Sequence, residues 1–483
     1  MTSEPARLST GIDGLDSILH GGLIEERSYM VRGPPGAGKT ILGFHFLLAG
    51  VERGERVLFI NLEEDLDDLK ANAASLGFET DDVDFLDLSP SADVFTEDES
   101  YDVFPTAEVE QQPLTEEIVE RVRAVEPERV VVDPLTQLRY LTSGEYQFRK
   151  QVVGFMRFLQ DQGATVLFTT QETDAVPTDD LQFISDGAVA FDIGSDGQFV
   201  SVPKFRGSPT RSGQHTFRID DAGMHVYPEL QPSDYAAEYA LEPLPTGVPE
   251  VDDLLHGGIE RGTTTIISGP TGVGKTTLGT QFTSAAADRG ERSVIYLFEE
   301  NEDTFLARSE AVGIPVAEMV ERGTLHVEEV DALEQSPQEF AESVRDEVAT
   351  NGTSIVMVDG VAGYRLTLQG RESQTNKHLH ALGKYLNNVG VATILVDETA
   401  EFHSDFRATS ENISYLADNV VFLRHLELQG ELTKAIGILK KRTSDFERTL
   451  RPYGITSDGI EVGEPLTDLR GIMTGTPEIR DQK

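Results

Sequence analysis

Two short stretches of this chain have the residue types and spacing needed to hold the phosphates of a nucleotide. Both follow the pattern G-x-x-x-x-G-K-[ST], in which glycines let consecutive backbone N–H groups turn toward a phosphate. The lysine supplies a positive charge for the outer phosphates, and the final hydroxyl can bind Mg²⁺. The first stretch consists of Gly33, Pro34, Pro35, Gly36, Ala37, Gly38, Lys39 and Thr40. The second consists of Gly269, Pro270, Thr271, Gly272, Val273, Gly274, Lys275 and Thr276, with Thr277 following as a further nucleotide-binding candidate.

An isolated match of this pattern could be a chance glycine-rich turn, so the flanking residues matter. Apolar runs that predict buried strands precede the two stretches at residues 28–31 and 265–268, and helical runs follow them. A helix that begins at the loop would also turn its N-terminal dipole toward the anion. The context therefore favours two phosphate-binding loops, hereafter P-loops.

The rest of the chain repeats at the same interval. Lys275 minus Lys39 is 236, and this offset also relates residues 8–11 to 244–247 and residues 21–22 to 257–258. Each copy has about 235 residues, the size of one α/β domain. We predict a tandem duplication with domains at residues 1–230 and 246–483, joined by a proline-containing linker at 231–245.

The order of apolar runs and helical segments indicates the fold class. Strands separated by helices predict an α/β fold in which each domain is a mostly parallel, doubly wound sheet flanked by helices. Asp359 minus Asp133 is only 226, so the first copy has about ten extra residues before Asp133, which we assign to an acidic loop.

Carboxylates follow several of the predicted strands, at the edge where open α/β sheets bind ligands. Two glutamate pairs stand there as candidates to activate or orient the attacking water, namely Glu63 with Glu64 and Glu299 with Glu300. Adjacent side chains at a strand end point to opposite sides, so one member of each pair would touch the water. The alternative is a solvated acidic turn.

Asp133 and Asp359 end apolar runs, as Walker-B aspartates do, and we expect them to hold Mg²⁺. The alternative is that each is a purely structural aspartate at the end of a strand.

Two basic pairs near the end of each copy are unusual in so acidic a chain. They are Lys204 with Arg206 and Lys440 with Arg442, and they lie far in sequence from their own P-loops. The charge that develops on a γ-phosphate requires cations, and ring NTPases often supply them from a neighbouring subunit. We therefore expect these pairs to act on the nucleotide of an adjacent copy, the alternative being solvated charges on a surface strand.

Composition restricts the setting. Eighty-four Asp+Glu against 40 Lys+Arg give a formal net charge of −44, which argues against a basic groove for nucleic acid. Such self-repulsion is screened at high salt, so we expect a halophilic cytoplasm. There is no cysteine, no apolar run long enough to span a membrane and no signal-peptide pattern at the start, so we expect a soluble, cytoplasmic protein.

Taken together, residues 8–16 and 21–23, both P-loops, both glutamate pairs and both Lys-x-Arg elements resemble the KaiC family of double-domain RecA-like ATPases. The resemblance covers essentially the whole chain. It implies two stacked six-membered rings of identical subunits, with ATP and Mg²⁺ bound between neighbours. It also implies ATPase activity in the first domain, autokinase activity in the second, and regulatory protein partners that the sequence does not name.

The resemblance also identifies a candidate phosphorylation site. By this resemblance, Ser414 matches the serine that is phosphorylated in the second domain of the cyanobacterial clock members of the family, whereas Tyr415 stands where those members have threonine. Phosphorylation of Ser414 alone is therefore the form of the autokinase hypothesis that this sequence supports.

Two other functions fit the same fold. A DNA-acting motor or recombinase would need cations in the loops that face the pore of the ring, yet residues 401–412 contain Arg407 together with Glu401, Asp405 and Glu411. A nucleotide sensor that switches partners without hydrolysis is the second alternative, although a sensor would not need the glutamate pairs.

Overall fold

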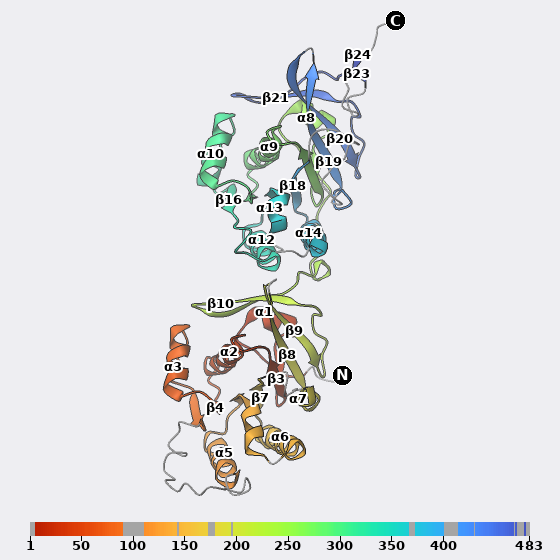
Figure 1. Cartoon of the computed structure of the whole chain (residues 1–483). Helices are drawn as coiled ribbons and strands as arrows, with labels where there is room; N and C mark the ends of the chain where they lie inside the picture. Colours follow the sequence, from red (N-terminus) through yellow and green to blue (C-terminus); the bar gives the residue numbers. More distant parts are fainter. Residues whose placement is uncertain are drawn as a thin grey trace. The chain divides into compact units, whose positions relative to one another are not determined.

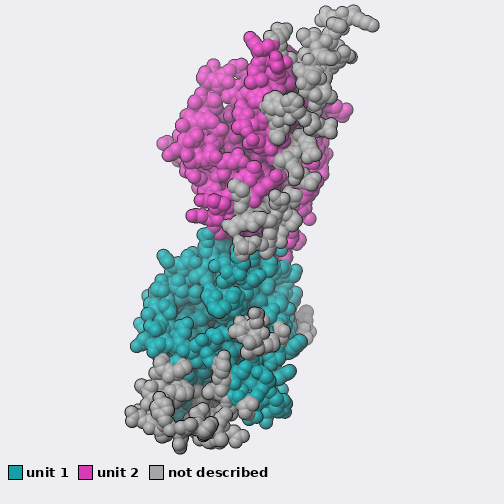
Figure 2. Space-filling model, in the orientation of Figure 1, with its two compact units in different colours: residues 1–229 teal, residues 230–483 magenta. Residues whose placement is uncertain are grey.

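The computed structural model describes residues 5–89, 111–142, 144–171, 179–194, 197–366, 372–399, 414–428, 430–467, 469–470 and 478–479. The chain forms two compact units, Met1–Glu229 and Leu230–Lys483 (Figure 2). Residues 231–245, predicted as a linker, make contacts within the second unit: the Tyr235 ring packs edge-on against Tyr385 at 5.0 Å, and Asn388 Nδ2 donates to Pro232 O at 2.7 Å.

The first unit is built on a nine-stranded sheet whose strand order is β11-β10-β9-β8-β3-β7-β6-β4-β5. The strands from β8 to β5 in this order pair in parallel, and β8 to β11 form an antiparallel meander. Their bounds are β3 Ser28–Arg32, β4 Val57–Asn61, β5 Asp84–Asp87, β6 Arg129–Asp133, β7 Thr165–Thr169, β8 Gly187–Gly194, β9 Gly197–Phe205, β10 His215–Asp220 and β11 Gly223–Tyr227.

The second unit repeats this topology in the order β16-β15-β17-β18-β14-β19-β20-β21-β22. Parallel pairing runs from β16 to β19, and antiparallel pairing from β19 to β22. The bounds are β14 Thr264–Gly269, β15 Ser293–Leu297, β16 Leu325–Glu329, β17 Ile355–Asp359, β18 Ala392–Glu398, β19 Asn419–Leu428, β20 Glu431–Lys441, β21 Arg451–Thr456 and β22 Gly459–Val462.

Helices cover both faces of each sheet (Figure 1). Those of the first unit are α1 Asp13–Ile18, α2 Lys39–Val51, α3 Leu66–Ser75, α5 Gln111–Val125, the 3-10 helix η1 Leu135–Leu141, α6 Glu145–Asp161 and α7 Asp179–Ile184. Those of the second are η2 Pro232–Asp234, α8 Pro249–Leu254, α9 Lys275–Asp288, α10 Glu302–Ala311, α11 Val316–Glu321, α12 Pro337–Asn351, α13 Val361–Leu366 and α14 Glu372–Asn388. Three short two-stranded pairs complete the described structure, β1 Arg7–Leu8 with β2 Leu23–Ile24, β12 Pro243–Leu244 with β13 Ile259–Glu260, and β23 Leu469–Arg470 with β24 Glu478–Ile479.

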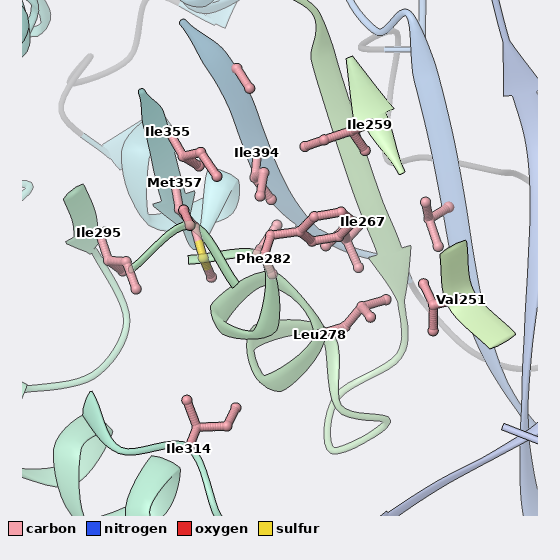
Figure 3. Close-up of a cluster of buried hydrophobic side chains, with 14 of the residues drawn as sticks. Val251, Ile259, Ile267, Leu278, Phe282, Ile295, Ile314, Ile355, Met357 and Ile394 are labelled. Carbon is pink, nitrogen blue, oxygen red and sulfur yellow. The ribbon is translucent and has the colours of Figure 1, made fainter. Parts of the chain in front are cut away.

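The core of each unit lies on the two faces of its sheet, because the central strands are buried on both sides. In the second unit, Leu278 and Phe282 of α9 pack against Ile267 of β14, Met357 of β17 and Ile394 of β18 (Figure 3). The helix that follows the P-loop is thereby fixed to the sheet, which holds the loop at the carboxyl ends of the strands. The predicted α/β, doubly wound fold of each domain is confirmed, whereas the acidic residues 93–110 lie outside the described residues.

Candidate nucleotide sites

The first P-loop connects β3 to α2 and has the backbone shape of a phosphate cradle. Gly36 and Gly38 have φ angles of 76° and 83°, in the left-handed region that glycine tolerates best, and Gly38 is the residue that caps α2. Lys39 Nζ lies over the loop, where it donates to Gly33 O at 2.9 Å and Pro34 O at 3.0 Å. Burial lowers the pKa of this ammonium. A phosphate entering the loop would replace these neutral carbonyl partners with an anionic one.

Asp133 ends β6 beside the loop and meets the final hydroxyl of the motif. Thr40 Oγ1 donates to Asp133 Oδ2 at 2.6 Å, and Thr169 Oγ1 donates to Oδ1 of the same carboxylate. Burial raises the pKa of Asp133, although these two hydrogen bonds act in the opposite direction. A hydroxyl and a carboxylate oxygen in contact are suitable ligands for Mg²⁺, which in such sites binds one or two protein groups together with phosphate and water. Among the described residues, no group of three or more His, Cys, Asp or Glu side chains is placed to hold a metal ion.

Glu63 and Glu64 follow β4 at the same edge of the sheet. The carbonyl of Glu64 accepts from Asn61 Nδ2 at 2.6 Å, and Glu63 Oε2 accepts from Gln171 Nε2 at 2.5 Å. Burial raises the pKa of Glu64, with the nearby charges of Asp133 and Glu63 adding to the effect. Gln171 was missed by the sequence analysis, although its position two residues after the end of β7 was a signal.

The second site has the same plan. Lys275 Nζ donates to Pro270 O at 3.0 Å, and burial lowers its pKa. Thr276 Oγ1 donates to Asp359 Oδ1 at 3.1 Å, while burial raises the pKa of Asp359 to about 7. Thr277 is half-buried in the first turn of α9.

The surroundings of the second glutamate pair differ from those of the first. Arg308 of α10 forms an ion pair with Glu300 at 2.5 Å, and Glu299 lies against Gly360, whose Cβ position would meet Glu299 Cγ at 2.7 Å. Burial raises the pKa of Glu300 while Arg308 opposes the rise. The sequence analysis missed Arg308 because it lies inside a helix, where an arginine has no special signature.

The strand next to each P-loop also ends differently in the two units. Val166 pairs with Ser28 in the first unit and Thr393 pairs with Thr264 in the second, so Glu398 occupies the place of Gln171. A carboxylate cannot donate to a glutamate, and Glu398 instead accepts from Thr271 Oγ1 of the P-loop at 2.6 Å. A further residue missed from the sequence contacts the same loop, because Lys434 Nζ of β20 donates to Gly272 O at 3.0 Å.

The basic pairs lie elsewhere, and their settings match between the units. Lys204 Nζ donates to Gln182 O at 2.5 Å and Ser185 O at 2.6 Å, and Arg206 lies 3.7 Å from Asp186 Oδ1. In the second unit, Lys440 Nζ donates to Ser414 O at 3.0 Å and Ala417 O at 2.6 Å, and Arg442 lies 3.2 Å from Asp418 Oδ1. Burial lowers the pKa of both lysines.

Strand register places each basic pair near the amino-terminal ends of the parallel strands. Its own P-loop lies at their carboxyl-terminal ends. Phe205 pairs with Gly187, which pairs with Tyr29 near the start of β3, whereas the P-loop begins where β3 ends. Five residues of β3 span roughly 16 Å at about 3.3 Å per residue. Lys440 likewise pairs with Val420, beside Ile266 of β14. The structure therefore brings together each P-loop, its aspartate and its glutamates, and keeps the Lys-x-Arg pair apart from them.

Ser414 is exposed at the start of a turn that precedes β19. Its carbonyl accepts from Lys440, so the candidate phosphorylation site and the second basic pair are neighbours. The predicted pore segment 401–412, with Arg407, lies outside the described residues.

Comparison with known proteins gives one family match for each of the two copies. The family model for the KaiC ATPase matches residues 8–231 and again residues 244–467. The chain belongs to the KaiC ATPase family. The circadian clock oscillator protein KaiC of Prochlorococcus marinus (strain MIT 9313) is 26% identical over 488 residues, covering 98% of this chain and 95% of that protein. KaiC of Thermostichus vulcanus is 25% identical over 493 residues, covering 99% of this chain and 92% of that protein.

None of the helices in the described ranges has the length and apolar content that a membrane span requires.

Proposed function

We propose that the chain binds and hydrolyses ATP at both sites, and that each site is completed by the Lys-x-Arg pair of a neighbouring copy in a hexameric ring. The observation that carries the second part is the position of these pairs. Lys204 and Arg206, like Lys440 and Arg442, stand at the sheet edge away from their own P-loop, yet both units keep the same anchoring contacts. A ring in which this edge faces the next P-loop would place two cations at a γ-phosphate.

The residues of each site would divide the work as follows. Backbone N–H groups of the P-loop bind the phosphates, and Lys39 or Lys275 neutralises the outer ones. Thr40 with Asp133, and Thr276 with Asp359, would hold Mg²⁺, which when bound neutralises charge on the phosphate oxygens.

The glutamate pairs would act on the attacking water. In the first site Gln171 orients the Glu63 carboxylate, which takes a proton as the water oxygen attacks the γ-phosphorus. ADP leaves as the bond between the γ-phosphorus and the bridging oxygen breaks, and the trans cations offset the charge on the transferred group.

The single-site variants Lys39→Ala and Lys275→Ala test the site assignment. Each is expected to lose one of two bound nucleotides per chain, because the lysine charge is needed at its own loop. Nucleotide retained by the protein after desalting in high salt gives the stoichiometry. Two nucleotides per chain in either variant would refute the assignment.

Glu63→Gln combined with Glu64→Gln separates an enzyme from a nucleotide sensor. In the Lys275→Ala background we expect this variant to keep ATP while turnover falls by about 10²-fold or more. Unchanged turnover would remove these glutamates from the mechanism.

The motor alternative requires that DNA stimulate ATP hydrolysis. The same assay with single-stranded DNA added tests it, and we expect no stimulation.

We also propose that the second site transfers the γ-phosphoryl group of ATP to the Ser414 hydroxyl of an adjacent copy, leaving ADP and phosphoserine. Supporting this, Ser414 is exposed and its carbonyl is held by Lys440, one of the two cations assigned to the neighbour's phosphate. Mass spectrometry of the Ser414 peptide after incubation with labelled ATP is the test, with Ser414→Ala as control. Label absent under conditions that support hydrolysis would leave an ATPase only.

The charge balance supports a salt-rich cytoplasm as the setting in which this assembly works. The 84 acidic residues exceed the 40 basic ones by 44, and the resulting repulsion would oppose ring assembly in dilute buffer but is screened at high ionic strength.

A further inference from the structure

A small cavity of about 140 Å³ lies in the second unit, away from both nucleotide loops. It opens between α14, which packs beside β18 (Figure 1), and the turn that precedes β19. Its base consists of Thr264, the first residue of β14, and Thr393, the second residue of β18, which places the cavity at the same end of the strands as Arg442.

The cavity lies at two positions where the units differ, since Gly383 and Thr393 stand in place of Met156 and Val166. Gly383 and Met156 each stand seven residues before the glycine that follows their helix, Gly390 and Gly163. Met156 is 2% exposed and fills the core of the first unit, whereas Gly383 leaves that space empty. A glycine inside a helix costs about 1 kcal/mol relative to alanine, so its presence suggests that the open space has a use.

A polar group at the base points to a ligand. Thr393 stands where the first unit has Val166, is 1% exposed, and its Oγ1 has no hydrogen-bond partner within the described structure. Leaving a buried hydroxyl unsatisfied costs about 1–3 kcal/mol. Nearby, Thr264 Oγ1 donates to Asn387 Oδ1 at 3.2 Å. A hydroxyl or carbonyl on a bound molecule would satisfy Thr393.

The other residues that line the cavity indicate which further chemical groups the ligand carries. Apolar side chains form the walls, namely Leu379, Leu382, Leu395 and Leu416. The charged side chains at the mouth are Lys384, Arg442 and Asp418. Asp418 accepts from Thr264 N at 3.0 Å and forms an ion pair with Arg442 at 3.2 Å, so Lys384 is the charged lining residue for which the described structure shows no ion pair. The ring of His380, another lining residue, lies 5.8 Å from that of Tyr415.

We propose that this cavity binds a small organic carboxylate that also carries a hydroxyl group. Its carboxylate lies at Lys384 and Arg442, its apolar body lies between the leucines, and its hydroxyl meets Thr393. A molecule the size of one substituted ring fits, because cavities of about 150 Å³ accept benzene. In the first unit, Met156 and Val166 stand at the positions of Gly383 and Thr393.

Occupancy would also act on the second nucleotide site, and this consequence rests on the proposed function. Arg442 and Leu416 line the cavity, and the turn from residue 414 to 418 anchors Lys440 through two carbonyls. A ligand that orders this turn would fix Lys440, while its carboxylate at Arg442 would compete with the neighbour's phosphate for that cation.

Binding to the full-length protein in high KCl without nucleotide is the direct test, with 4-hydroxybenzoate as the probe. Ligand-observed NMR at about 10 mM detects a Kd near 1 mM, which is ample for a molecule of this size. Benzoate lacks the hydroxyl and 4-hydroxybenzamide lacks the charge, so we expect each to bind about fivefold more weakly. Absence of wild-type binding for all three probes would overturn the proposal.

Variants of the cavity residues locate the binding. Gly383→Met is expected to reduce affinity at least about tenfold by filling the space, whereas the control Gly383→Ala retains it, because its methyl group would lie 3.4 Å from Thr264 Oγ1. Thr393→Val, which restores the residue of the first unit, should abolish the preference for 4-hydroxybenzoate over benzoate. Wild-type affinity in Gly383→Met, or an unchanged preference in Thr393→Val, would refute this location.

The effect on catalysis is measured in the Lys39→Ala background, where turnover comes from the second site. We expect 4-hydroxybenzoate to change this turnover by at least about twofold, and to have no effect when Gly383→Met is added. Binding without any change in turnover would contradict the coupling to Arg442 while leaving the ligand site established, so the two claims fail separately.

Discussion

At the scale of single side chains, the two nucleotide sites differ in what holds their glutamates. Gln171 donates to Glu63 in the first site. Glu398, at the same strand position in the second, can only accept and turns to Thr271. The motif spacing predicted the loops and the glutamates from local sequence. These partners were not predictable, because each contact depends on which strands become neighbours.

Exchanging the two residues should partly exchange the behaviour of the sites. Gln171→Glu would place two carboxylates together and turn Glu63 away from the water, so we expect first-site turnover to fall about five- to tenfold. Glu398→Gln would supply the missing donor and raise second-site turnover. Both are measured with the other site silenced by Lys275→Ala or Lys39→Ala. Unchanged rates in both variants would show that this position does not orient the glutamate.

A partly buried histidine makes the stability of the first unit depend on pH. Burial lowers the pKa of His45 to about 4, from 6.5, and its Nε2 accepts from Met224 N at 2.8 Å, which requires the neutral ring. The unfolded chain therefore binds the proton more readily, so this contribution to stability is complete above pH 6.5 and is lost as the pH falls toward 4.

When the pH falls from 7 to 5, we expect His45 to lower the free energy of unfolding of the first unit by on the order of 1–2 kcal/mol, after discounting for its partial exposure. His45→Gln should remove this loss, since the second unit already has Gln281 at the repeat position, 236 residues on. Hydrogen exchange of the α2 peptide reports it, with the α9 peptide as internal control. Equal pH dependence in wild type and variant would be inconsistent with a neutral His45.

At the scale of elements, the sequence predicted the central parallel strands because each is a short apolar run followed by a helix. The apolar runs at 129–133 and 355–359 coincide with β6 and β17. The antiparallel meanders were not predicted in detail, since their strands are only half-buried and alternate irregularly. Their register nevertheless decides where Lys204 and Arg206 lie.

The junction between β3 and α2 should be the most sensitive backbone element of the first site. At Gly38 (φ 83°) an added Cβ would lie 2.6 Å from Ile219 Cδ1, whereas at Gly36 (φ 76°) it would meet nothing within 4 Å. Both alanine substitutions strain the loop, by about 1–2 kcal/mol, but only Gly38→Ala is also crowded. We expect ATP affinity at this site to fall about tenfold in Gly36→Ala and further in Gly38→Ala. The reverse order would contradict the loop geometry.

At the scale of the whole molecule, the repeat in the sequence predicted two copies of one fold, and composition predicted a dependence on salt. The proposed ring rests on the family resemblance and on the expectation that the basic pairs act on a neighbouring copy, because a ring interface has no local sequence signature. Strand register adds a physical reason for it, since it separates each basic pair from its own P-loop.

With a formal charge of −44, the protein should gain stability as salt screens its self-repulsion. We expect the midpoint of thermal unfolding to rise steeply from 0.1 to about 2 M KCl. Sucrose at equal osmolality, which stabilises by exclusion without screening, should produce a smaller rise. Equal effects of the two solutes would indicate that charge repulsion is not the limiting factor.

Mixing two inactive variants tests the central claim most directly. In the Lys275→Ala background, Lys39→Ala lacks a working P-loop and Arg206→Ala lacks the cation for its neighbour, so each alone should hydrolyse little ATP. Rings assembled from equal amounts should regain about one quarter of the parental rate, because one interface in four joins an intact P-loop to an intact arginine. Native mass spectrometry verifies that the rings are mixed. Full activity of Arg206→Ala alone, or mixed rings without recovery, would contradict catalysis shared between neighbours.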